Sequence, residues 1–169
     1  IRDLHDIPYR EEEEGSRIVM LPPADVIINP KQEDCPYPFK KLCGAAVAWR
    51  LAEALYIEAG ISREEFLDLA EFAAVATVGD IMDLTGENRI LVKYGLRRLE
   101  QTKNPGYRAL IAVNGLEGKK LTAYHIGFVI GPCINASGRL DTAKRALRLL
   151  GAESKAEAEE LAGDLKALN

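Results

Sequence analysis

Apolar residues recur at helical spacing through most of the chain and are separated by short polar turns. From Leu42 to Ala59 they occupy nearly every side, so we predict a core helix that ends at Gly60. Ser62 and Glu65 have the spacing of a capping box, in which two side chains satisfy the free amides at a helix start. A second helix is therefore predicted to begin there and to run through the next apolar segment.

That next segment, from Phe72 to Val78, has almost no polar face and stands directly before an acidic stretch. It predicts a buried helix, and Gly79 suits its C-terminal end. Such a helix would carry Asp80 from the core to a surface or cleft, where packing fixes a carboxylate as a metal site requires. Spacing alone also allows a commoner role, in which Asp80 or Asp83 caps the following helix.

The rest of the chain is also predicted to be mostly helical. The apolar stripe of the last helix needs a covering surface, which we expect within the same molecule or at the start of an inter-domain helix. Strands are expected over 25–28 and, as a second candidate, over 18–21. Further helices are expected over 87–101, 107–113 and 122–130, then from Asp141 or Thr142 to Gly151, and from Ser154, which pairs with Glu157; residues 131–140 are expected to form a loop.

Composition limits the classes of protein to which the chain can belong. With 169 residues, of which 47% are hydrophobic, it can bury a core of its own. A net charge of −4 excludes a global basic field, so any nucleic-acid contact must be local or metal-mediated. Cys35, Cys43 and Cys133 match no zinc spacing, which favours reduced thiols and a cytoplasmic location. The uncharged stretch 121–138 contains Pro, His and Gly residues, so we expect no membrane association.

Four segments carry a resemblance that no single one would establish. The segment 76–89 reads ATVGDIMDLTGENR, and the others are 28–32 with 35–40, 42–48, and 131–140. Taken in chain order, they resemble motifs of the DHH phosphoesterases, in the form found in RecJ-type single-stranded-DNA-specific exonucleases. The resemblance covers about residues 3 to 150.

This resemblance implies a fold and a function. We expect an α/β, helix-rich part of a parallel-sheet DHH domain, with few strands in this chain. Residues 1–120 would be the C-terminal part of that domain, and 121–169 would be helices leading toward a C-terminal domain. The parent protein would be a metal-dependent 5′-to-3′ exonuclease acting on single-stranded DNA in repair and recombination, with replication or repair proteins as candidate partners.

The resemblance also implies a metal site. Asp3-Leu4-His5 stands where the family has its Asp-His-His signature, so Asp3 and His5 are candidate catalytic residues. Asp80 matches the metal-binding Asp of the motif at 76–89 and is a candidate metal ligand. Such an oxygen-rich set suits Mn²⁺ or Mg²⁺, of which the family uses two ions. Leu4 replaces a His ligand, so we expect an incomplete site and little activity from this chain alone. The alternative for His5 is an exposed residue at a frayed chain end.

Asn135 and Arg139 match family positions that face the nucleic-acid cleft. Arg is suited to forked contacts with phosphate, although an ordinary salt bridge is the alternative for Arg139. Many relatives have Arg where Cys133 stands, and we expect a buried structural thiol there. A second hypothesis is a non-catalytic RecJ-like scaffold that binds nucleic acid or a replication partner. Leu4 and the net negative charge of the chain favour this hypothesis.

Overall fold

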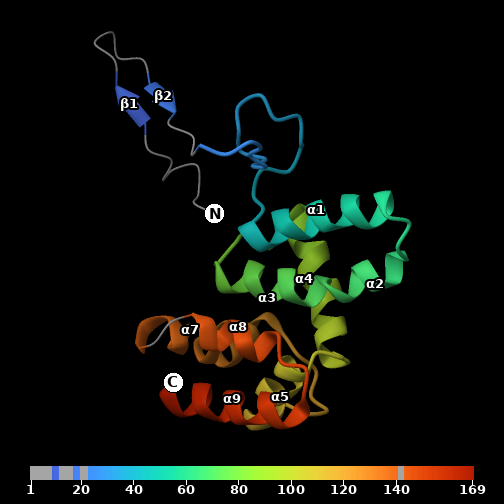
Figure 1. Cartoon of the computed structure of the whole chain (residues 1–169), viewed down its shortest axis with the longest axis vertical. Coiled ribbons are helices and arrows are strands. Elements are labelled where there is room, and N and C mark those ends of the chain that lie inside the picture. Colours follow the sequence, from blue (N-terminus) through green and yellow to red (C-terminus); the bar gives the residue numbers. More distant parts are fainter. Residues whose placement is uncertain (1–8, 12–16, 20–22, 141–142) are drawn as a thin grey trace.

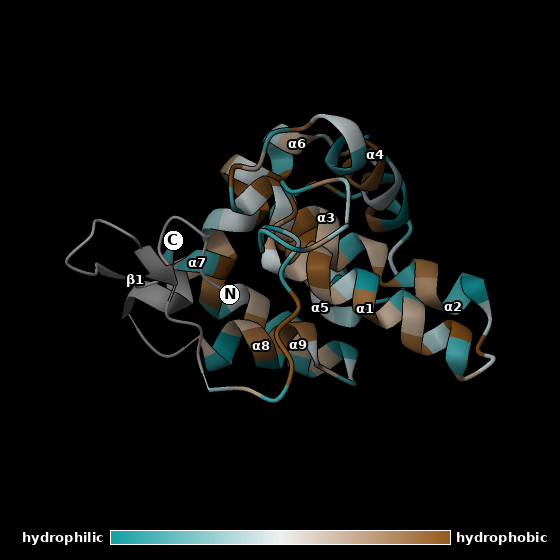
Figure 2. Ribbon diagram, turned by 90° about the horizontal axis from the view of Figure 1, so that it is seen from above, coloured by the Kyte–Doolittle hydropathy of each residue, from teal (hydrophilic) through white to brown (hydrophobic). Residues whose placement is uncertain are grey.

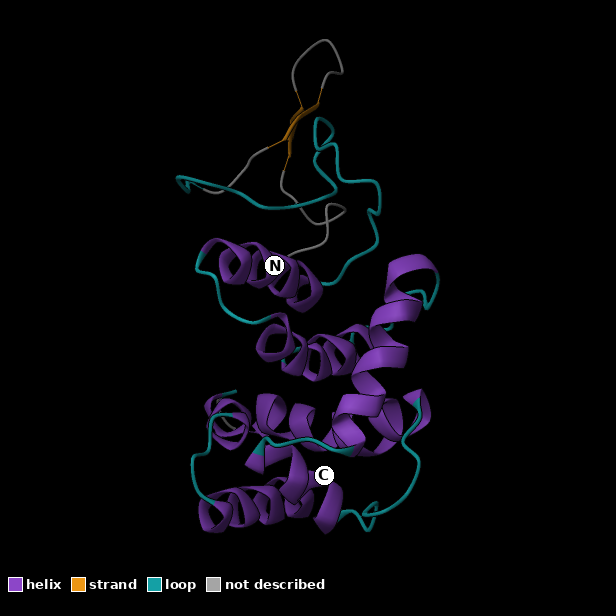
Figure 3. Ribbon diagram, turned by 90° about the vertical axis from the view of Figure 1, so that its right-hand side faces the viewer, coloured by secondary structure: helices purple, strands orange, loops and turns teal. Residues whose placement is uncertain are grey.

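The protein is a stack of helices. A computed structural model describes residues 9–11, 17–19, 23–140 and 143–169, with side-chain surroundings for 23–135 and 143–169. Figure 1 shows the helices in tiers, from α1 at the top to α5 and α9 at the bottom, with α4 crossing the tiers. Figure 3 shows the same tiers from the side, with helices making up nearly all of the regular structure. The elements are β1 (Tyr9–Glu11), β2 (Arg17–Val19), α1 (Gly44–Glu58), α2 (Arg63–Asp68), α3 (Ala70–Gly79), α4 (Gly86–Glu100), α5 (Pro105–Val113), α6 (Ala123–His125), the π-helix η2 (Ile126–Ile130), α7 (Gly131–Leu140), α8 (Lys144–Leu150) and α9 (Lys155–Leu168).

Within the described ranges, the only sheet is a two-stranded antiparallel hairpin of β1 and β2, in which Arg10 pairs with Ile18. The candidate strand at 18–21 is thus confirmed over its first two residues, whereas the strand predicted over 25–28 is wrong. Those residues form a loop with Val26 and Ile28 exposed. The Ile27 carbonyl accepts a hydrogen bond at 3.2 Å from the side-chain amide of Gln32, and not from the backbone of a neighbouring strand.

The upper core joins α1, α3 and α4. The facing positions of these helices are filled by small and apolar residues, and Figure 2 shows apolar residues concentrated around α3. Gly95 of α4 lies directly on α3, because a Cβ atom there would be 2.6 Å from the Ala70 carbonyl oxygen and would overlap the Ala74 side chain. Close backbone contact of α3 and α4 therefore depends on a residue without a side chain.

The lower core joins α5, η2, α7, α8 and α9 around Leu110, Ile126 and Leu149, none of which is exposed. The stripe on α9 is covered by these helices, so packing within the molecule is confirmed for its first four members, and Leu168 remains partly exposed. The buried members of the stripe are Ala158, Leu161, Ala162 and Leu165.

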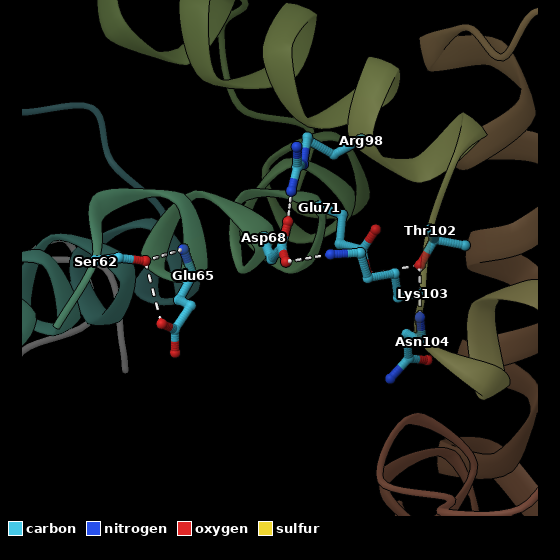
Figure 4. A network of polar contacts seen from close by, with 8 residues as sticks. All are labelled: Ser62, Glu65, Asp68, Glu71, Arg98, Thr102, Lys103 and Asn104. Atoms are coloured by element: carbon cyan, nitrogen blue, oxygen red, sulfur yellow. Dashed lines mark hydrogen bonds and ion pairs between the residues drawn. The ribbon is translucent and has the colours of Figure 1, made fainter.

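A buried polar chain links the two cores (Figure 4). Thr102, just after α4, donates from its hydroxyl to the Glu71 carboxylate of α3 at 2.8 Å and accepts from the backbone amide of Asn104 at 3.0 Å. The side-chain amide of Asn104 donates to the Leu150 carbonyl at 2.8 Å. Burial raises the pKa of Glu71 above its ordinary value, although the Thr102 hydrogen bond opposes this shift.

Two predicted elements differ from the observed ones. The helix predicted from Ser62 to Asp80 is interrupted at Leu69, which ends α2 and stands before α3. Residues 131–140 form the helix α7, so the loop predicted there is wrong. Pro132 has no backbone N–H and cannot make the usual helical hydrogen bond. The helix continues through it because the widened turn of η2 precedes it, in which the Gly131 amide donates to the Ile126 carbonyl.

The remaining helix expectations are largely confirmed. Ser62 and Ser154 each accept a hydrogen bond from the backbone amide three residues later, as the capping pattern predicts. Helix α8 begins at Lys144 after Ala143, while Asp141 and Thr142 lie outside the described residues. In the part of the chain that the structure describes, no helix has the length and apolar character needed to cross a bilayer.

Candidate metal-ligand and nucleic-acid site

Helix α3 places Asp80 at the molecular surface, as predicted. Its interior is fixed by Thr77, which is fully buried, donates to the Ala73 carbonyl at 2.7 Å and contacts the Cys43 sulfur at 3.4 Å. Asp80 occupies the C-cap position and is exposed. Its carboxylate has no hydrogen bond or ion pair with the described residues, so it is available to a ligand.

The chain leaves α3 through a Schellman motif, a helix ending closed by two backbone hydrogen bonds. The Met82 amide donates to the Thr77 carbonyl at 3.1 Å, and the Ile81 amide donates to the Val78 carbonyl at 3.0 Å. The residue in the left-handed position is Ile81, with φ of 54°, and not Gly79. A β-branched residue in this conformation is strained, and it lies directly beside Asp80.

Neither Asp80 nor Asp83 caps the next helix, so the capping role considered for them is wrong. Thr85 is the N-cap residue of α4 and makes no side-chain capping bond. Asp83 instead pairs with Lys41, whose Nζ lies 2.6 Å from its carboxylate. The hydrogen bond and charge of Lys41 lower the pKa of Asp83.

Asn88 connects the segments on either side of this loop, and sequence reasoning missed it. Its buried side-chain amide donates to the Lys41 carbonyl at 2.7 Å and to the Asp83 carbonyl at 3.0 Å. Asn88 shares the buried face of α4 with Leu91 and Val92. The sequence does carry a signal for Asn88, because a polar residue at a core position of an amphipathic helix indicates a buried hydrogen-bonding role.

A second clamp fixes the loop before α1. The Glu87 carboxylate accepts from the Arg50 guanidinium at 2.7 Å and from the Tyr37 hydroxyl at 2.8 Å, and Arg50 also binds Glu53 at 2.7 Å. Burial, followed by the hydrogen bond to Glu87, raises the pKa of Tyr37. The sequence pattern placed Arg50 and Glu53 on a wetter side of α1, whereas the structure makes both parts of this clamp.

Asn135 lies on α7 and lines a cleft of about 960 Å³. Gly79 and Ile81, the two neighbours of Asp80, line the same cleft, so the structure brings two predicted site positions to one region. Arg139 follows Asn135 by four residues on α7, and its side chain lies outside the described residues. The spacing of four places both positions on one side of the helix.

Comparisons with curated proteins and with solved structures find the same relatives. No protein-family model matches the chain. It is 41% identical over 149 residues to the single-stranded-DNA-specific exonuclease RecJ of Bacillus subtilis (strain 168), covering 88% of this chain and 18% of that protein. It is 38% identical over 159 residues to RecJ of Escherichia coli (strain K12), covering 88% of this chain and 28% of the relative.

Solved structures give the same result. A crystal structure of exonuclease RecJ bound to manganese matches 88% of this chain and 37% of its own, with a TM-score of 0.78 and 38% identity. RecJ from Thermus thermophilus in complex with Mn²⁺ matches 80% of this chain and 20% of its own, with a TM-score of 0.71 and 39% identity. The chain is similar to one segment of these RecJ exonucleases. It spans 18% to 28% of the length of the curated RecJ relatives named above.

The RecJ match leaves two predicted residues without a structural account. Asp3 and His5 lie outside the described residues. Among the residues that the structure does describe, no group of three or more His, Cys, Asp or Glu side chains could hold a metal ion. Asp80 is therefore the one predicted ligand that has a described position.

Two further side chains of this RecJ-like segment have structural roles. The Cys133 thiol is 1% exposed and donates to the Val129 carbonyl at 3.2 Å, so the prediction of a buried structural thiol is confirmed. His125 Nδ1 accepts from the Thr122 backbone amide at 3.1 Å and completes a capping box at the start of α6.

Proposed function

We propose that the chain is the segment of a RecJ-like, metal-dependent single-stranded-DNA exonuclease that contributes Asp80 to the active site. The observation that carries this proposal is the match to RecJ over 88% of the chain at 38% to 41% identity. The relatives are named single-stranded-DNA-specific exonucleases, and solved RecJ structures contain Mn²⁺ or Mg²⁺. The parallel α/β sheet of a DHH domain and digestion from 5′ to 3′ are parts of the same proposal.

The donor set of the described residues does not by itself fit a metal ion. Of the predicted ligands it supplies one carboxylate, that of Asp80, which a buried helix holds in place. One carboxylate cannot fill the near-octahedral shell that Mg²⁺ requires. We therefore propose that Asp80 is one of several ligands to Mn²⁺ or Mg²⁺, with Asp3 and His5 as candidate contributors. This chain alone is expected to have little or no nuclease activity.

Single-stranded DNA is the proposed substrate. Asn135 and Arg139 are the proposed contacts to it, supported by the position of Asn135 in the cleft beside Asp80. The division near residue 120, a cytoplasmic location and contacts with replication or repair proteins are further proposals that follow from the RecJ relationship.

A non-catalytic scaffold is the second candidate function. It is favoured by the lack of a group of three metal-binding side chains among the described residues and by Leu4 in the Asp3-Leu4-His5 segment. A scaffold would keep the fold and bind nucleic acid or a protein partner, and its carboxylates would have no role in hydrolysis.

Grafting distinguishes the two candidates. The whole 169-residue chain, including Asp3-Leu4-His5, would replace the matching segment of Bacillus subtilis RecJ, and release of nucleotides from labelled single-stranded DNA would be measured with Mn²⁺. The graft is expected to be active, and Asp80→Asn is expected to abolish its activity, while Asp83→Asn retains most of it. Asp83 is the matched control because it is an exposed carboxylate three residues away that is paired with Lys41.

The scaffold predicts a different outcome. A correctly folded graft without nuclease activity, or one in which Asp80→Asn leaves the rate unchanged, would contradict the exonuclease proposal. Folding of each graft would be checked by circular dichroism and by thermal unfolding, so that loss of structure is not mistaken for loss of chemistry.

A further inference from the structure

The cleft beside Asp80 has an exposed aromatic wall. Tyr124 of α6 and Phe128 of η2 are stacked, with ring centroids 5.0 Å apart and planes inclined by 29°. Tyr124 is 64% exposed and Phe128 is 71% exposed, although Ile126 and Ile130 of η2 are fully buried. Two large rings left open to solvent at a cleft are typical of a binding surface.

A second part of the lining comes from the loop after α3. Ile81, Met82 and Leu84 form it, and Ile81 is 91% exposed. Ile81 also occupies the left-handed position of the Schellman motif, where glycine would be free of strain. The fold thus holds a strained, exposed apolar side chain at the cleft, a combination that favours function over stability.

The chemistry of the lining selects the ligand. Among the described residues, no Lys or Arg side chain lines the cleft, so its side chains offer no positive charge to a phosphate or to an acidic peptide. Asn135 provides a neutral group able both to donate and to accept hydrogen bonds. Asn169, at the end of α9, also lines the cleft, so an aromatic platform with apolar walls and two amides matches the faces and edges of a nucleobase.

We propose that this cleft holds a base of single-stranded DNA, stacked against Phe128 and Tyr124 and covered by Ile81. The inference rests on the proposed function and names the part of the substrate that the cleft takes. Stacking accounts for binding by a chain whose net charge is −4, because it does not depend on a basic surface. It also predicts little preference among bases, since every base offers a π face.

The test compares two fluorescent oligonucleotides of equal length, an oligothymidylate and an abasic strand, binding to the 169-residue chain without metal. Anisotropy is expected to show about 10-fold tighter binding of the oligothymidylate. Phe128→Leu should remove this preference, and Phe128→Trp should keep it. Leu147→Ala is the matched control, because Leu147 is 73% exposed on α8 and does not line the cleft.

Ile81→Gly gives a second, independent readout. It should raise the urea midpoint, because glycine relieves the left-handed strain, and it should weaken oligothymidylate binding, because the Ile81 side chain is lost. A merely structural role for Ile81 predicts no change in binding. Opposite changes in stability and affinity would therefore support a role for Ile81 in binding.

Three results would overturn the inference. They are equal affinity for the two strands, unchanged binding after Phe128→Leu, and no measurable binding of either strand. If the cleft is instead covered by another part of a longer nuclease, Phe128→Leu will lower the stability of the grafted nuclease without changing its preference for intact over abasic DNA. Failure here leaves the Asp80 test untouched, because that test measures hydrolysis by the graft.

Discussion

Gly95→Ala tests the close packing of α3 on α4, which positions Asp80. The added Cβ would lie 2.6 Å from the Ala70 carbonyl oxygen and would overlap the Ala74 side chain. The two contacting atoms are a backbone oxygen and a Cβ atom of α3, so no side-chain rotation can relieve the contact. The two helices must move apart for the methyl group to fit.

Two opposing effects set the magnitude. Alanine is preferred over glycine inside a helix by about 1 kcal/mol, which favours the variant. Overpacking of a well-packed core costs typically about 1–3 kcal/mol, and this contact lies at the severe end because a backbone atom is involved. The net expectation is a loss of about 1–2 kcal/mol in the free energy of unfolding.

Urea denaturation followed by circular dichroism would measure the change. Gly163→Ala is the matched control, because Gly163 is also inside a helix, α9, and a Cβ there would meet nothing within 4 Å. The control should gain up to about 1 kcal/mol from helix propensity. If Gly95→Ala also stabilises the protein, the α3–α4 contact is not as close as described and the reasoning fails.

Three other changes probe the two cores and the polar groups that join them. Glu71→Gln should become more stable relative to the wild type as pH rises above 4.5, because the raised pKa of Glu71 means that the wild type loses stability when this buried carboxyl ionises. Urea titrations at about pH 4 and about pH 8 would measure this difference in the free energy of unfolding. A difference that does not change with pH would mean that Glu71 is solvated. Asn88→Ala should cost about 2 kcal/mol in unfolding experiments, because two carbonyls lose their donor, and a loss below about 0.5 kcal/mol would mean that water replaces it. Leu165→Ala should lower stability by about 2–5 kcal/mol through a cavity under α9, whereas a thermal midpoint near that of the wild type would place Leu165 outside the core.

Local sequence signals predicted the elements that depend on local physics. The capping serines Ser62 and Ser154 and the buried run before Gly79 gave helix starts and an end at the right places, since caps and periodicity act within a few residues. The surface position of Asp80 followed from the same pattern.

Tertiary context decided the rest. Gly131 and Pro132 are typical of a loop, yet the packing of α7 on α9 and the π-helical turn before Pro132 allow a continuous helix. Residues 25–28 have strand-like composition but no partner strand among the described residues. Asn88 and the Glu87–Arg50 clamp depend on contacts between segments more than 35 residues apart, which no local pattern encodes.

Binding of Mn²⁺ to the grafted nuclease tests most directly whether Asp80 is a metal ligand. Calorimetric titration would compare the graft with its Asp80→Asn and Asp83→Asn forms at equal folding. The RecJ relationship predicts that Asp80→Asn weakens Mn²⁺ binding at least about 10-fold, since even residues that only orient a ligand contribute that much. Asp83→Asn should leave the affinity unchanged. Equal Mn²⁺ affinity in all three proteins would contradict the assignment of Asp80 to the metal site.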